Sequence, residues 1–151
     1  MTHEELCRNI IEGTQEAIIF ADQEGLIQLW NAGAEAIFGF SATEAIGRSL
    51  DLIIPDRQRA RHWEGYRNVM ATGVTRYGQE VLAVPAVRKD GTRISLEFTV
   101  VLLREGTGEL VGIAALMREV TARWQQDRAL RQRVAELEAA VASREKPVST
   151  K

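Results

Sequence analysis

The 151-residue sequence has about the length of one domain, and its 45% hydrophobic and 26% charged residues are typical of a soluble globular protein. The net charge of −2 gives no long-range attraction to nucleic acid or anionic lipid, and no apolar run approaches the ~20 residues that span a bilayer. Residues 1–5 are acidic, whereas a secretory signal begins with basic residues. The single cysteine, Cys7, excludes an internal disulfide. We therefore expect a cytoplasmic protein that binds neither nucleic acid nor membrane.

The N-terminal part of the chain predicts a helix followed by a hairpin. Residues 4–14 have the apolar spacing of a short amphipathic helix. Two apolar runs, 17–21 and 26–30, flank turn residues at 22–25. Runs of this length on either side of a turn favour two paired antiparallel strands.

Two short helices are expected next. Asn31 is a suitable N-cap for a helix over 32–38, because its side-chain oxygen can accept from the first free N–H groups, and Gly39 ends that helix. A one-turn helix over 44–46 ends at Gly47.

A longer helix is predicted from Asp56 to residue 72, with Gly73 just beyond its end. Apolar or large side chains recur along it at the spacing of one helix face: His62, Tyr66, Val69 and Met70. His62 is therefore expected to face the same way as the residues that pack inward.

The second half of the chain predicts a three-stranded meander over residues 75–87, 93–103 and 109–118. Segments 89–91 and 105–108 carry the glycine and polar residues typical of hairpin turns. Apolar and polar residues alternate in the middle strand, which predicts one buried face and one wetter face.

A helix without glycine or proline is expected over residues 121–144. Its apolar residues follow the 4, 3, 4 spacing of a coiled-coil seam: Leu130, Val134, Leu137 and Val141. The expected organisation is a leader helix over 1–14, a globular domain over 15–120, this C-terminal helix, and a disordered tail over 145–151.

No catalytic constellation is visible in the sequence. The chain has two histidines, His3 and His62, and no glycine-rich phosphate motif follows a predicted strand. The sequence therefore does not predict an enzyme.

Five sequence blocks together resemble the PAS sensory family: 25–31, 34–40, 44–48, 88–92 and 118–123. The resemblance implies an α+β fold, a five-stranded antiparallel sheet with helices on one face and flanking helices at both ends. It also implies a ligand pocket between sheet and helices, homodimerisation through the flanking helices, and a signal passed to the C-terminal helix. Glu119 stands where the family usually has the aspartate of its Asp-x-Thr junction.

Members of this family bind haem, flavins, small organic acids or no ligand. In the branch of oxygen-sensing haem kinases, the proximal histidine lies on the long helix, eleven residues before the glycine that ends it. Counting back from Gly73 selects His62 as the ligand of haem b, whereas counting from residues 65–66 selects Trp63. Met70 or Met117 could supply a sixth ligand or simply fill the core.

The same resemblance places other residues around the haem. Arg76 would pair with a propionate, and the distal side would be lined by Tyr77, Leu82, Phe98 and Val100. The oxygen sensors have an arginine at the position of Leu82, and a leucine cannot donate a hydrogen bond to bound oxygen. CO, NO or redox sensing would therefore suit this site as well as O2.

The alternative is a PAS dimerisation or interaction module that binds a small metabolite, a flavin or no cofactor. The flavin photoreceptor branch uses a reactive cysteine in the region that corresponds to residues 47–56, and no cysteine occurs there. Light-driven thiol chemistry is therefore not expected, although flavin binding without it remains open.

Overall fold

The computed structural model describes residues 1–75 and 81–145, with the backbone alone at Leu82. The chain divides into two compact units, Met1–Glu119 and Val120–Lys151. Within the described ranges, no helix combines the length and the apolar composition needed to cross a membrane.

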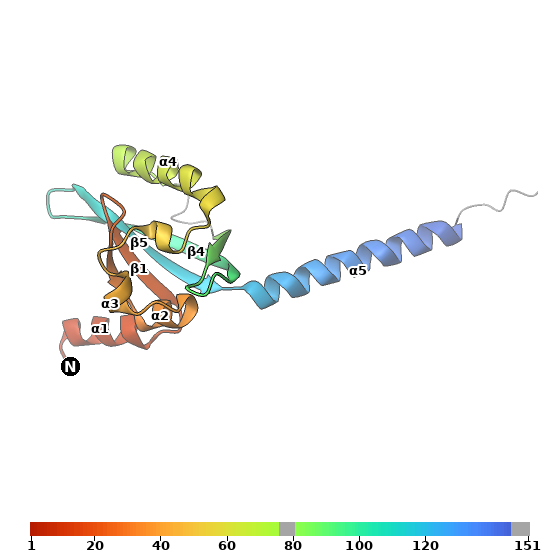
Figure 1. Cartoon of the computed structure of the whole chain (residues 1–151), viewed down its shortest axis with the longest axis horizontal. Coiled ribbons are helices and arrows are strands. Elements are labelled where there is room, and N and C mark those ends of the chain that lie inside the picture. Colours follow the sequence, from red (N-terminus) through yellow and green to blue (C-terminus); the bar gives the residue numbers. More distant parts are fainter. Residues whose placement is uncertain (76–80, 146–151) are drawn as a thin grey trace, which may run out of the picture. The chain divides into compact units, whose positions relative to one another are not determined.

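The first unit is built on a five-stranded antiparallel sheet with the strand order β2-β1-β5-β4-β3, shown in Figure 1. This sheet and its helices confirm the expected α+β fold, including the hairpin formed by the first two strands. The strands are β1 (Ala17–Asp22), β2 (Ile27–Trp30), β3 (Leu82–Val87), β4 (Arg93–Arg104) and β5 (Leu110–Glu119).

The helices begin and end where local capping signals stand. The Asn31 side chain accepts from the Ala34 N–H at 2.9 Å, and Gly39 and Gly73 end their helices in the left-handed conformation, at φ 83° and 67°. The helical segments are α1 (His3–Gly13), α2 (Ala32–Phe38), α3 (Ala42–Ala45), the 3₁₀ turn η1 (Leu50–Leu52), α4 (Asp56–Thr72) and, in the second unit, α5 (Thr121–Glu145).

Strand β3 is shorter than the sequence indicates. The apolar pattern predicts a strand over 75–87, but the strand begins at Leu82, and neither Thr75 nor Val81 belongs to it; residues 76–80 lie outside the described part of the chain. Pairing with β4 ends at the Leu82–Phe98 partners. Val81 lies before that pairing and is exposed, so its apolar character does not reflect a place in the sheet.

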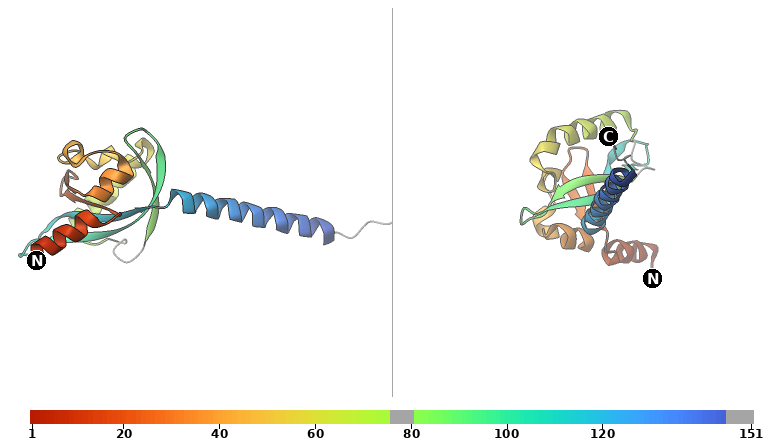
Figure 2. Two further views of the ribbon diagram at one scale, coloured as in Figure 1. Left: turned by 90° about the horizontal axis from the view of Figure 1, so that it is seen from below. Right: turned by 90° about the vertical axis from the view of Figure 1, so that its right-hand side faces the viewer.

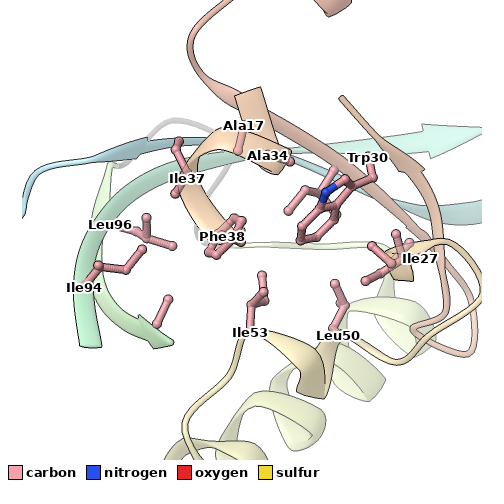
Figure 3. Packing of buried hydrophobic residues seen from close by; sticks show 14 of the residues in the cluster. Ala17, Ile27, Trp30, Ala34, Ile37, Phe38, Leu50, Ile53, Ile94 and Leu96 are labelled. Carbon is pink, nitrogen blue, oxygen red and sulfur yellow. The ribbon is translucent and has the colours of Figure 1, made fainter. Parts of the chain in front are cut away.

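The core lies between the sheet and the helical segments that cover one of its faces. Phe38 of α2 and Leu96 of β4 are fully buried there, together with Ile53 from the segment after η1 (Figure 3). The Trp30 ring lies 5.4 Å from that of Phe38, and its Nε1 donates to the Phe40 carbonyl at 2.9 Å. We define this covered side as the inner face of the sheet.

One fully buried polar side chain, Asn31, connects three elements. Its oxygen accepts from the N–H groups of Ile18 and Ala34, and its amide donates to the carbonyls of Ile11 and Glu16. Because these four bonds satisfy the amide, its burial costs little. They also fix the end of α1 beside β1 and α2, which lie next to one another in Figure 2.

Helix α4 lies well apart from α1 and α2 (Figures 1 and 2) and is anchored to the β1–β2 turn. Tyr66 is the one residue of α4 that is buried. Its hydroxyl donates to the Asp22 carbonyl and lies 3.2 Å from the carbonyl of Ala21. Burial among these acceptors raises the pKa of Tyr66, so the phenol remains a neutral donor.

A second anchor is the indole of Trp63. Its Nε1 donates to the Asp51 carboxylate at 2.7 Å, which joins α4 to η1. The ring lies directly on Gly25 in the β1–β2 turn, where φ is +80° and an added Cβ would stand 2.2 Å from the ring. Glycine at this position therefore satisfies both the turn and the close approach of α4.

Substituting Gly25→Ala is predicted to destabilise the protein by about 2–4 kcal/mol, because it combines a left-handed alanine with overpacking against Trp63. Gly47→Ala is the matched control, since Gly47 has φ +86° and no atom near the added methyl. The control should cost only about 1–2 kcal/mol. Urea unfolding measures both, and equal losses would show that the Trp63 contact does not hold α4.

Candidate functional site around His62

His62 lies on α4 beside both anchor residues. Its ring centroid is 4.8 Å from that of Trp63 and 5.8 Å from that of Tyr66. The side chain is half-buried, yet its Nδ1 atom is buried and has no hydrogen-bond partner among the described residues. A buried ring nitrogen without a partner is costly, so this atom is a candidate ligand contact.

The surroundings of His62 favour an uncharged ring. Burial lowers the pKa of His62 below its ordinary value of 6.5, and the nearby Asp51 carboxylate opposes this shift only in part. At neutral pH the imidazole is therefore neutral. A neutral imidazole has the free lone pair that metal ligation requires.

Two further predicted residues, Phe98 and Val100, lie on the inner face of β4. Both are half-buried, whereas the β1 residues of the same rows are fully buried. The register of the sheet aligns each of them with residues of β5 and β1: the rows are Ala17–Met117–Phe98 and Ile19–Ala115–Val100. The apolar side chains on the inner face are therefore more exposed on β4 than on β1.

Met70 lies farther along α4 and borders a hollow of about 400 Å³. The hollow is lined by Gln23, Arg67, Met70, Ala71 and Leu110. Met70 follows His62 by eight residues, or roughly 12 Å along a helix, and His62 does not line this hollow. The structure therefore does not place these two predicted residues in one cavity.

The remaining predicted residues are only partly placed. Leu82 is located by its backbone, opposite Phe98 at the start of β3. Arg76 and Tyr77 lie outside the described residues.

Sequence reasoning missed Asp51, which interacts with three α4 side chains. It accepts from Trp63, influences the pKa of His62, and lies 3.8 Å from Arg59 Nε. Arg59 also donates to the carbonyls of Ile54 and Asp51, so its guanidinium is held at the start of α4. The sequence offered one signal for Asp51: it is an acidic residue close to Ser49, which caps an apolar segment. The same pattern is equally typical of an ordinary turn.

Sequence reasoning also missed an ion pair between two strand ends. Arg88, directly after β3, donates to the Glu119 carboxylate at the end of β5. Arg88 Nε is buried and has no further partner among the described residues. Both side chains are about one-third exposed, so the pair contributes at most about 1 kcal/mol. It links the ends of two strands that β4 separates in the sheet.

The chemistry of these residues fits a haem iron in two respects. His62 offers a buried, neutral nitrogen donor without a competing hydrogen bond. The inner face offers partly uncovered apolar side chains at Phe98, Val100 and Met117. A large apolar macrocycle with one axial ligand requires both features.

The chain is similar to known proteins in both sequence and fold. A family model described as "PAS fold" matches residues 11–125. A protein of Azorhizobium caulinodans is 35% identical over 124 residues, which cover 82% of this chain, and the sensor protein FixL of Bradyrhizobium diazoefficiens is 31% identical over 108 residues, which cover 70%. The chain spans only 17% and 21% of the lengths of these two relatives.

Solved structures share the same architecture. The PAS domain of a Colwellia psychrerythraea protein has a TM-score of 0.70 at 20% identity, covering 80% of this chain and 99% of that one. An RNA-binding light-oxygen-voltage receptor has a TM-score of 0.70 at 21% identity, covering 93% of this chain and 39% of that one. At these identities the likeness concerns the fold alone.

The lowered pKa of His62 predicts a pH-dependent stability. Above about pH 6.5 both folded and unfolded chains carry a neutral ring; as the pH falls through 6.5, the unfolded chain binds a proton first, so the free energy of unfolding decreases. Urea unfolding between about pH 7.5 and 5.5 measures this slope. His62→Gln should flatten it and the exposed His3→Gln should not; an unchanged slope in His62→Gln would contradict the assignment.

Proposed function

The chain belongs to the PAS fold family, and on this basis we propose that it is a sensory module that holds haem b through His62 and signals to α5. The observation that carries the proposal is the buried, neutral and unpartnered Nδ1 edge of His62. The similarity to sensor protein FixL supports the sensory part of the proposal.

His62 would hold the haem iron through a ring nitrogen, and because the imidazole is neutral, no proton would have to be displaced before it binds. The rings of Trp63 and Tyr66 limit its rotation by packing 4.8 and 5.8 Å away. When bound, the haem iron supplies a site for a diatomic gas or for a change of oxidation state.

Selectivity among signals would follow from the residue types that the family resemblance assigns to the far side of the haem. Leu82, Phe98 and Val100 have no hydrogen-bond donor in their side chains. Bound O2 is polar and gains from a donor, whereas CO and NO depend on one less. The proposed signals are therefore CO, NO or redox state as well as O2, with Tyr77 as the candidate donor.

The signal route follows strand β5. Ala115 and Met117 lie beside Val100 and Phe98, and two residues beyond Met117 the strand ends at Glu119. A ligand that binds better to one position of the inner face shifts the population toward that position. Because Arg88 ties Glu119 to the end of β3, such a shift also changes the alignment of the strand that leads into α5.

The hollow beside Met70 favours a second candidate function, the sensing of a small metabolite. The hollow is open to solvent and has a volume of about 400 Å³, and Arg67 provides a cation at its wall. In this case His62 would be a half-buried helix residue with no role in binding.

Titration of the purified protein with hemin tests the first candidate. An intense absorption band near about 400 nm, shifting after reduction and addition of CO, is expected for the unaltered chain. His62→Ala should bind hemin at least about tenfold more weakly, because the axial bond is lost, while His3→Ala should bind as before.

Equal hemin affinity of the His62→Ala and His3→Ala variants, with far-UV circular dichroism unchanged, would contradict haem ligation by His62. A featureless spectrum after hemin addition would contradict it as well. A flavin-like double band in the purified protein would favour the alternative cofactor.

A further inference from the structure

The C-terminal end of α4 is held by a residue from another element. Arg104 is the last residue of β4. It donates from Nη2 to the Gly73 carbonyl and from Nη1 to the Gly108 carbonyl, each at 3.0 Å. Gly73 ends α4, whereas Gly108 lies in the β4–β5 turn. One guanidinium therefore bridges the end of the helix and the tip of the hairpin.

The helix end is suited to a cation at this place. The last carbonyls of a helix carry a partial negative charge, and the last turn of α4 contains no basic residue of its own. Arg104 supplies the cation from β4. Gly73 leaves room for it, because an added Cβ would stand 2.7 Å from Nη2 of Arg104.

This bridge completes a ring of contacts around the hollow beside α4. Tyr66 joins α4 to the β1–β2 turn at the Asp22 carbonyl. The next residue, Gln23, donates from Nε2 to the Leu110 carbonyl at 2.7 Å, and Leu110 pairs with Arg104 in the sheet. Gln23 and Leu110 also line the hollow. Three segments that are distant in the sequence thus meet at its rim.

The contacts of this ring differ in their exposure to solvent. The bonds of Tyr66 and Gln23 are at least partly buried, whereas both bonds of Arg104 are exposed. Between Tyr66 and Gly73, no residue of α4 is buried. Because water replaces an exposed hydrogen bond at little cost, the contact of Arg104 with α4 should open before the other two.

We propose that Arg104 is a latch for the hollow. It holds residues 67–72 of α4 beside the β4–β5 turn, and breaking its bond to Gly73 lets this half of the helix move outward about Tyr66. A ligand of the hollow that binds the open form better than the closed form shifts the population toward the open form. The latch consists of contacts within this chain, so it does not depend on haem binding by His62.

Hydrogen exchange of the full chain, without hemin, tests the latch. Arg104→Met keeps the length of the side chain but cannot donate, so the amides of residues 70–73 should exchange about three- to tenfold faster. The amides of residues 60–66 should keep their rates, because Tyr66 stays bonded to the β1–β2 turn. The matched control is Arg93→Met at the opposite end of β4, which is also exposed and should change neither set.

Three results would overturn the proposal. Equal exchange of residues 70–73 in Arg104→Met and in the unaltered chain would show that Arg104 does not hold the helix. Acceleration spread evenly over all of α4 would exclude Tyr66 as the pivot. Acceleration confined to the β4–β5 turn would mean that Arg104 stabilises only its own hairpin.

Thiol labelling tests whether the hollow itself opens. In a Cys7→Ser background, Met70→Cys places a thiol at the wall of the hollow, and Met117→Cys places one at a half-buried position of β5 outside it. Dithiobis(nitrobenzoate), an aromatic disulfide, should label Met70→Cys about three- to tenfold faster once Arg104→Met is added, and Met117→Cys at an unchanged rate. If the rate at Met70→Cys does not rise, or if both rates rise equally, the latch does not close the hollow.

Discussion

The contact between α4 and the β1–β2 turn is the constraint on which the candidate site depends. Tyr66 and Trp63 fix the helix there, through the carbonyl of Asp22 and the surface of Gly25. Apart from Tyr66, no residue of α4 is buried. The helix is therefore held at a few points, and it leaves part of the inner face of the sheet less covered than the rest of the core.

This arrangement has a dynamic consequence. An element with few buried contacts opens at a lower free-energy cost than the core strands beside it. Displacing α4 would break the contacts of Tyr66 and Trp63 with the β1–β2 turn.

Local features of the fold could be predicted because they depend on neighbouring residues. Asn31, Gly39 and Gly73 mark helix ends through capping chemistry that the sequence displays directly. The start of β3 could not be predicted, because strand length is set by pairing with β4, a distant segment. The tendency of an apolar run to form a strand carries no information about where its partner ends.

The same distinction holds for the site. The inward position of His62 follows from helical spacing, whereas its unpartnered Nδ1 atom and its interaction with Asp51 arise from tertiary packing. The pairing of Arg88 with Glu119 spans 31 residues and depends on the order of the strands. No local sequence pattern indicates the order of the strands in the sheet.

The most direct measurement of the central claim is resonance Raman spectroscopy of the reduced, gas-free haem complex made with ¹⁵N-labelled histidine. Because the chain has only two histidines, an iron–nitrogen stretching band that shifts on labelling, persists in His3→Gln and disappears in His62→Ala would identify His62 as the ligand. A band that is unaffected by labelling, or that survives in His62→Ala, would contradict the account.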